Sequence, residues 1–129
     1  MPIKVSTIAT TVMPWVAARN GKVDVVYYGT QASSPDDAGA IWNTYDSQFS
    51  AGSWSIGTVS NSPNRIGAVC FEGSGCAGNV NRELLDLFEV AEDPSTGKAA
   101  VVYTDSTQNT WTQGGTTKEL PEIVLAFEQ

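Results

Sequence analysis

The sequence predicts an all-β fold built from a repeated unit, and three observations indicate it. Residues 21–27 (GKVDVVY) and 97–103 (GKAAVVY) share five of seven residues at an offset of 76. A Val-Ala pair precedes each copy, as Val16-Ala17 and Val90-Ala91. Helical periodicity is nearly absent, and short apolar segments alternate with Gly, Asn, Ser, Pro and Asp. An internal repeat of this kind reflects a repeated structural unit.

Eight segments have the pattern of β-strands. They are residues 3–9, 13–18, 23–28, 41–48, 54–59, 84–91, 98–104 and 122–129. Residues 13–18 are almost wholly apolar, which predicts a strand buried on both faces. Asn20-Gly21 predicts a tight hairpin after it. A short amphipathic helix over residues 81–92 is the alternative to the strand at 84–91, but the repeat favours the strand.

The remaining residues form loops of two lengths. Because neighbouring antiparallel strands alternate in direction, the long polar loops 29–40, 60–81 and 105–120 are expected at one end of the sheets. The short turns are expected at the opposite end. Binding residues usually lie on long loops carried by a rigid scaffold. We therefore expect one functional face, which includes the loop 60–81.

By strand type, the order along the chain is 4-1-2-3-4-1-2-3. Four antiparallel strands with an apolar inner strand are typical of a β-propeller blade. The chain is then a single two-blade module, residues 1–129, with one strand and a blade in 1–60 and a loop and an incomplete blade in 61–129. Soluble proteins avoid open sheet flanks, so we expect the leading strand of one copy to complete the last blade of the next, in a closed ring.

Composition excludes several classes of partner. The 129 residues carry 14 acidic and 7 basic side chains, a net charge of −7, and no histidine. The bases are scattered, so neither nucleic acid nor an anionic membrane surface is expected as a partner. No apolar run reaches the length of a membrane span, and the first residues lack a signal-peptide pattern. We expect no cofactor and no metal.

Cys70 and Cys76 are the two cysteines. A zinc site would need four ligands, and no histidine can join these thiols. The spacing therefore favours a local disulfide, with two free thiols as the alternative. A disulfide would indicate an extracellular or periplasmic location. Without a signal-peptide pattern, the compartment is left open.

Three stretches carry a resemblance to a known family. They are residues 14–18 with 23–30, Trp42-Asn43-Thr44-Tyr45, and residues 67–76 followed by 82–88 and 90–94. In these the chain resembles the C-terminal part of the sialidase-type (Asp-box, or BNR-repeat) β-propellers. The resemblance implies a six-bladed ring, which three chains would close as a homotrimer.

The chain also departs from that family. The Asp-box falls on residues 47–54, where Ser47 and Trp54 match but Phe49 and Ala51 replace its Asp and Gly. The resemblance implies that a sialidase needs three arginines, a Tyr-Glu pair and an Asp from many blades, which this chain does not supply. A non-catalytic, carbohydrate-binding module is therefore the first hypothesis. The alternatives are a subunit or fragment of a sialidase-like exo-glycosidase, and an engineered or excised propeller fragment.

Five side chains on the expected functional face could contact a ligand, and Asp86 is one of them. Arg82 and Arg65 could hold an anionic sugar or carboxylate. Their structural alternatives are an ion pair of Arg82 with Asp86 or Glu83, and a solvated loop position for Arg65. Trp42 and Trp111 could stack on a sugar ring. A strand position favours packing for Trp42, whereas Trp111 lies in the expected polar loop.

Weaker patterns complete the candidates. Asp36, Asp37 and Asp105 could share a calcium ion, but the spacing of an EF-hand is absent. Tyr27 and Tyr103 follow the repeated Val-Val pairs and are expected in the core. Glu72 and Tyr28 are the nearest match to a nucleophilic pair, with no spacing to support it.

Overall fold

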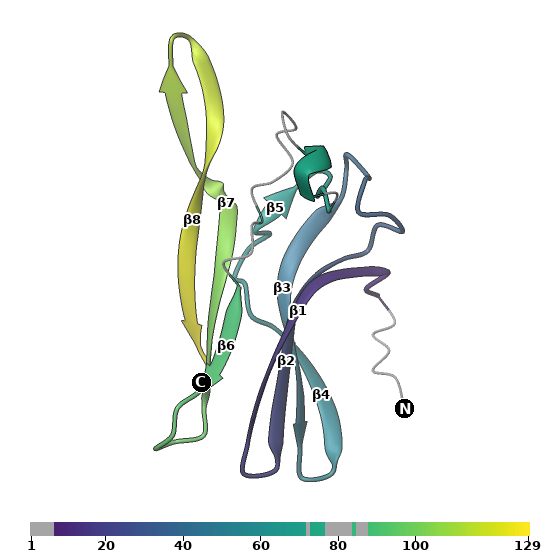
Figure 1. Ribbon diagram of the computed structural model, residues 1–129, viewed down its shortest axis with the longest axis vertical. Helices are drawn as coiled ribbons and strands as arrows, with labels where there is room; N and C mark the ends of the chain where they lie inside the picture. The colour runs from purple at the N-terminus through teal and green to yellow at the C-terminus, as the bar shows by residue number, and fades with distance from the viewer. Residues whose placement is uncertain (1–6, 72, 77–83, 85–87) are drawn as a thin grey trace.

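The computed structural model describes residues 7–71, 73–76, 84 and 88–129 (Figure 1). The expected all-β class is confirmed: these residues form β-strands in two antiparallel sheets, with one 3₁₀ turn at Gly73–Cys76 and no α-helix among them. No helix in this described part has the length and apolarity needed to cross a bilayer.

The first sheet is an antiparallel meander in chain order. It contains β1 (Thr10–Arg19), β2 (Lys22–Thr30), β3 (Ile41–Ser50) and β4 (Ser53–Thr58). A two-residue strand, β5 (Arg65–Ile66), pairs with the start of β3. Two-residue turns join β1 to β2 and β3 to β4, and the longer connection 31–40 joins β2 to β3.

The second sheet has three strands, β6 (Glu89–Glu92), β7 (Ala99–Gln113) and β8 (Thr116–Phe127). It lies beside the first sheet, with β6 against β1 and β2 (Figure 1). Residues of both sheets share one apolar core, which includes Val12, Val26, Tyr28, Trp42, Val90, Val101 and Tyr103.

Two-residue turns close three of the hairpins. Asn20-Gly21, Ala51-Gly52 and Gly114-Gly115 all have positive φ at both residues. This is the type I′ geometry, whose twist matches that of paired strands, and Asn-Gly adopts it readily. The predicted hairpin at Asn20-Gly21 is confirmed.

The sequence repeat is also a repeat of strand register. Val16 pairs with Val25 in the first sheet, and Val90 pairs with Val101 in the second. Each pair therefore occupies the same position in its sheet, since Val25 and Val101 are 76 residues apart. The turns 20–21, 51–52 and 93–98 lie at one end of the molecule and the long connections 31–40 and 59–71 at the other, as strand direction predicted (Figure 1). The tip of the β7–β8 hairpin also lies at this second end.

The prediction that residues 13–18 are buried on both faces is wrong. The side chain of Val16 is 61% exposed and that of Trp15 is 50% exposed. β1 is an edge strand, and only one face of its sheet is covered by the second sheet. A bulge at Met13-Pro14, where Met13 has a φ of 52°, also shifts the register between Val12 and Trp15.

The predicted polar loop 105–120 is also wrong. β7 continues to Gln113 and β8 begins at Thr116, so these residues form a long hairpin. The register shifts between Asp105 and Asn109, at the point where the hairpin leaves the core. Beyond that bulge its side chains are exposed on both faces, which is why their polar pattern resembled a loop.

Two predicted strands fall partly outside the described residues. Residues 3–6 of the expected first strand, 3–9, lie outside the described residues. Residues 7–9 are not in a strand, although the amide of Ala9 donates to the carbonyl of Thr30 at 2.9 Å. Of the expected strand 84–91, residues 89–91 belong to β6.

Candidate functional site

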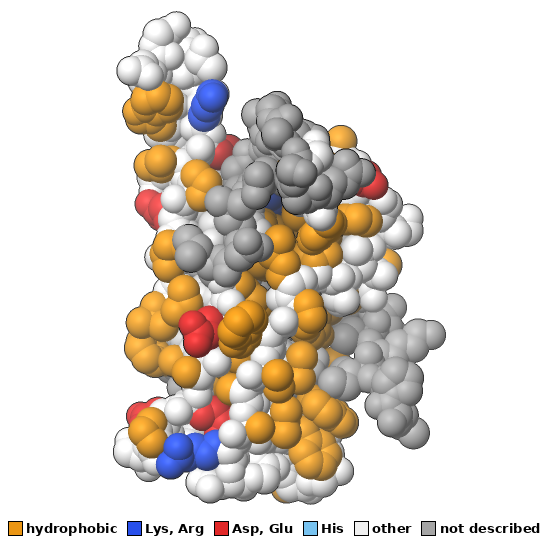
Figure 2. Space-filling model, viewed as in Figure 1, with side chains coloured by type: hydrophobic (Ala, Val, Ile, Leu, Met, Phe, Trp, Pro, Cys, Tyr) orange, Lys and Arg blue, Asp and Glu red, His pale blue; other side chains and the backbone are white. Residues whose placement is uncertain are grey.

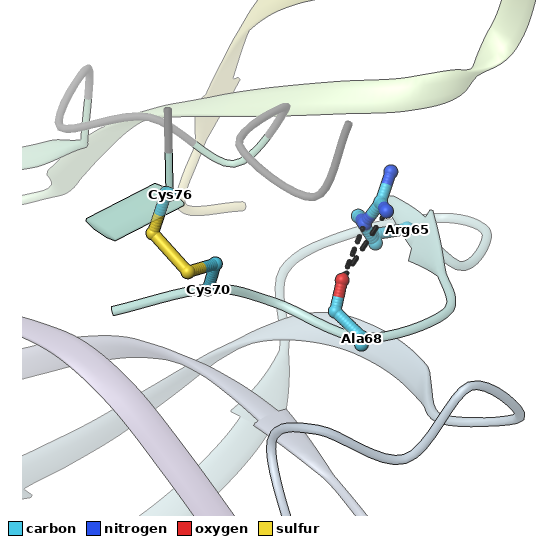
Figure 3. Close-up of a disulfide and its surroundings, with 4 residues drawn as sticks. All are labelled: Arg65, Ala68, Cys70 and Cys76. Carbon is cyan, nitrogen blue, oxygen red and sulfur yellow. Dashed lines mark hydrogen bonds between the residues drawn. A yellow bond between two sulfur atoms is a disulfide. The ribbon is translucent and has the colours of Figure 1, made fainter. Parts of the chain in front are cut away.

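The Cys70–Cys76 disulfide at the long-loop end is confirmed (Figure 3). The sulfur atoms are 2.06 Å apart and the Cα atoms 6.0 Å apart. Cys76 is buried, whereas Cys70 is partly exposed. The bridge closes the stretch that follows β5 and contains the 3₁₀ turn.

Arg65, in β5, lies beside this stretch and is buried, with only 4% of its surface exposed. Its Nε and Nη2 atoms donate to the carbonyl of Ala68 at 3.3 and 3.2 Å (Figure 3). Its Nη1 atom lies 3.1 Å from Oε2 of Glu119 on β8. The alternative of a solvated loop arginine is therefore wrong. Arg65 joins its own loop to the long hairpin.

A second set of bonds holds the same loop against the bulge of β7. The amide of Ser106 donates to the carbonyl of Asn64 at 2.9 Å, and the Asn64 side chain donates to the carbonyl of Thr104 at 3.2 Å. Asp105 accepts from the amide of Thr107 at 2.8 Å. The bulge leaves backbone groups of β7 without partners in the hydrogen-bond ladder to β8, and Asn64 forms hydrogen bonds with two of them.

The two candidate tryptophans have opposite environments. Trp42 is fully buried, and its Nε1 atom donates to the carbonyl of Gly67 at 2.9 Å. The packing interpretation of Trp42 is confirmed, and its ring has no free face for a sugar. Trp111 is 47% exposed and lies opposite Lys118 near the tip of the hairpin. Its ring remains accessible, but from a strand and not from a loop.

The tyrosines and acidic candidates occupy separate places. Tyr27 stacks on Tyr45 with ring centroids 6.0 Å apart, and Tyr103 is in the core, as expected. Asp36 and Asp37 are exposed in the connection before β3, whereas Asp105 is buried in the β7 bulge. Among the described residues, no three acidic, cysteine or histidine side chains lie close enough to hold a metal ion.

The remaining candidates lie outside the described residues. They are Arg82, Asp86, Glu83 and Glu72. Their predicted roles stay predictions.

The sequence analysis missed a polar network between the two sheets near the short-turn end. Lys22 Nζ lies 3.2 Å from Oδ2 of the fully buried Asp24 and also bonds to Oε2 of Glu128. The side-chain amide of Gln48 donates to Asp24 Oδ1 and to Glu128 Oε1, both at 3.0 Å. Glu128 also accepts from the amide of Ala99 at 2.8 Å. The network therefore joins β2 and β3 to β7 and β8.

The network sets the ionisation of its members. Burial alone would raise the pKa of Glu128, but hydrogen bonds from Lys22, Ala99 and Gln48 and the charge of Lys22 lower it to about 2. Burial would lower the pKa of Lys22, but Glu128 and Asp24 raise it instead. These two groups are thus held in their charged forms.

Two further carboxyl groups stand beside the network with the opposite shift. Burial, followed by the negative charge of Asp24, raises the pKa of Asp46 to about 7. Burial and Asp24 likewise raise the pKa of Glu92. Asp46 and Glu128 both line an open pocket of about 530 Å³ between the sheets, with Val101, Tyr103 and Ala126. Because Glu128 is fully engaged in the network, this arrangement joins the sheets and offers no free ion pair to a ligand.

Sequence spacing gave little sign of this network. Lys22 and Glu128 are 106 residues apart. The one local signal is that Asp24 breaks the apolar pattern of its strand, where the repeat has Ala100.

Comparisons with protein-family models, with curated proteins and with solved structures find no match to this chain. The arrangement of the two sheets and of the long-loop end is therefore what bears on function.

Proposed function

We propose that the chain is a non-catalytic, sialidase-like β-propeller module that assembles into a ring of identical copies and binds carbohydrate at its long-loop end. One observation carries the proposal. The two sheets repeat each other in register and pack on each other, yet the second sheet has three strands where the meander of the first sheet has four, β1 to β4.

The strand order supports the propeller. In the first sheet the strands run in chain order from β1 to β4, and β1 contacts the first strand of the second sheet, β6. A blade of a propeller has this order, with its first strand nearest the centre of the ring. The strand missing from the second sheet is the one that a neighbouring copy would lend.

The long-loop end supports a ligand site. The disulfide, Arg65 and Asn64 fix the backbone of the connection after β4 against the long hairpin. A rigid surface of this kind reduces the entropy lost on binding. On the same hairpin, Trp111 presents an accessible flat ring, the side chain that most often stacks on the apolar face of a sugar.

Two of the described acidic side chains at this end are held by bonds within the chain, which favours binding over catalysis. Asp105 is bonded to Thr107 and Glu119 to Arg65. A glycosidase needs a pair of carboxyl groups that flank the scissile bond and are free to exchange protons.

Two measurements test the proposal. Light scattering coupled to size exclusion should give about three times the chain mass of 13.7 kDa, and a glycan array should show binding without turnover of a fluorogenic sialoside. Trp111→Ala should weaken glycan binding by about tenfold, the loss of one stacking contact. Leu120→Ala, an equally exposed apolar side chain on the same hairpin, is the control. A monomer would contradict the ring, and an array without hits from folded protein would contradict the carbohydrate site.

A further inference from the structure

Each sheet has two faces that carry different side chains. The repeat shows which face of the first sheet is equivalent to which face of the second. The front face of the first sheet carries Val26 and Tyr28 and packs on the second sheet. Its rear face carries Val16, Val25 and Phe49, which alternate with the front residues along their strands. By register, the rear face of the second sheet carries Val90 and Val101, and its front face carries Val102, Ile123, Leu125 and Phe127.

The contact within the chain joins one front face to one rear face. The phenol oxygen of Tyr28, on the front face of the first sheet, accepts from the amide of Thr104 on β7 at 2.9 Å. Its ring packs on Phe88 with centroids 4.4 Å apart. Two faces are left over: the rear face of the first sheet and the front face of the second.

Equivalent positions in the two sheets differ sharply in burial. Val90 is 4% exposed because the first sheet covers it, whereas its equivalent, Val16, is 61% exposed. The uncovered rear face of the first sheet also carries Trp54 and Ile56, paired with Phe49 and Ser47. Toward the long-loop end Ile8 lies against this face beside Gly29, so the open part is nearer the short turns.

The uncovered front face of the second sheet is also apolar. Ile123, Leu125 and Phe127 alternate along β8 and are each more than half exposed. Figure 2 shows hydrophobic side chains gathered along the β7–β8 side and over the lower part of the first sheet. A solitary two-sheet protein is expected to place polar residues on both outer faces, because water contacts them.

One pair of positions indicates what covers these faces. Within the chain, Gln48 on the front face of the first sheet bonds to Glu128 on the rear face of the second at 3.0 Å. By register, Gln48 is equivalent to Phe127, since Asp24 pairs with Gln48 and Ala100 with Phe127. Glu128 is equivalent to Phe49, since Ala99 bonds to Glu128 and Val23 pairs with Phe49.

The two leftover faces therefore match each other at this position. A polar pair, Gln48 with Glu128, closes the contact inside the chain, and an aromatic pair, Phe127 with Phe49, occupies the same two places on the open faces. A mixed pair, with Glu or Gln on one face and phenylalanine on the other, would be unfavourable. The polar side chain would face a phenyl ring and lose its hydrogen bonds. Both positions therefore differ between the contact inside the chain and the open faces, polar in the one and aromatic in the other.

We propose that the front face of the second sheet binds the rear face of the first sheet in another copy of this chain, with Phe127 of one copy packed against Phe49 of the next. The contact is head-to-tail and uses two different surfaces, so each copy can bind one neighbour on either side. This inference rests on the proposed ring and names the surfaces that would form it.

Mixing two variants tests the pairing of faces. Phe127→Asp should disable the front face of the second sheet and Phe49→Asp the rear face of the first. Each variant alone should assemble only at concentrations at least about 30-fold higher than wild type, the loss expected when a central aromatic contact is removed. Mixed in equal amounts, they should form a 1:1 pair, because each still has the face that the other lacks. If one face instead contacted the same face of another copy, mixing the two variants would not restore the contact.

Sedimentation of each sample, with circular dichroism to check folding, gives the readout. Val16→Asp, at a more exposed position of the same rear face, replaces Phe49→Asp if that variant does not fold. Wild-type protein that assembles while both single variants also assemble would overturn the pairing and leave the ring standing. Wild-type protein that stays monomeric would overturn both the pairing of faces and the ring. The glycan array alone would then test the carbohydrate site.

Discussion

Lys22 neutralises Asp24 in the contact between the two sheets, with Nζ 3.2 Å from a carboxylate that has no exposed surface. A buried charge that loses its partner is strongly destabilising, because burial removes the water that would otherwise solvate it. The two residues lie in one strand, yet their effect extends to the second sheet through Glu128.

Replacing Lys22 by Met keeps the apolar stem and removes the charge. We expect Lys22→Met to lower the free energy of unfolding by about 3 kcal/mol, because Asp24 would stay buried without a cation. Urea unfolding measures this loss. Lys98→Met is the matched control, since Lys98 has the equivalent place in the repeat but is exposed, and we expect a change within about 0.5 kcal/mol. Equal losses in the two variants would contradict the role of Lys22.

Asp46 should make the protein less stable as the pH rises. Its pKa is about 7 in the folded chain against an ordinary value of 3.8. The folded state therefore binds the proton more tightly, and this contribution to stability is present below about pH 4 and lost as the pH rises through about 7. Thermal unfolding from pH 4 to 8 should show a falling melting temperature, and Asp46→Asn should flatten it. An unchanged slope in that variant would count against the assignment.

Glu128 should have the opposite effect in acid. Its pKa is about 2 against an ordinary value of 4.5, so its contribution is present above about pH 4.5 and lost as the pH falls through about 2. Glu128→Gln should therefore reduce the loss of stability between about pH 4.5 and 2, measured by urea unfolding at each pH. Gln48→Ala, which removes one of its donors, should shift the acid transition upward by a smaller amount.

Tyr28 satisfies a buried amide across the sheet contact. Its oxygen accepts from the backbone of Thr104, and burial raises its pKa to about 12. Tyr28→Phe should cost about 1–3 kcal/mol, because the amide of Thr104 would lose its partner. Tyr103→Phe, a ring in the same core whose hydroxyl bonds no described backbone amide, should cost less. Chemical denaturation of both variants checks the difference.

The disulfide should contribute modestly to stability. It closes a short ring, for which the loop-entropy relation gives about 2 kcal/mol. Cys70→Ser with Cys76→Ser should lower the unfolding free energy by that amount and leave the sheets intact. A loss of all β-structure in the double variant would mean that the bridge organises more than its own loop.

Local signals predicted the first sheet well. Asn20-Gly21 marked the first hairpin, and the repeat placed the second set of strands. The same reasoning failed at residues 105–120, where Thr, Gln, Asn and Glu on both faces concealed a hairpin that Gly114-Gly115 could have revealed. Strand alternation is visible only when one face is buried, and this hairpin extends beyond the core.

The site was harder to predict than the fold. The Cys70–Cys76 disulfide was predicted from the spacing of the two cysteines, and the packing interpretation of Trp42 was correct. Arg65 was a candidate ligand contact with a solvated loop position as the alternative. Its buried ion pair was missed because Glu119 comes from a hairpin that was not predicted. The network around Lys22 depends on contacts across more than 100 residues, which no local pattern reveals.

The bulge at Asp105–Asn109 divides β7 into two parts with different protection from solvent. Before the bulge, β7 lies in a core shared by both sheets; after it, β7 pairs with β8 among the described strands and its side chains are exposed. Amide protons of the outer part should exchange with solvent through brief local opening. Those of Val101 and Tyr103 should exchange only when the whole protein unfolds. The outer part of the hairpin, which carries Trp111, can thus open locally while the bonds of Asn64 at the base of the hairpin stay formed.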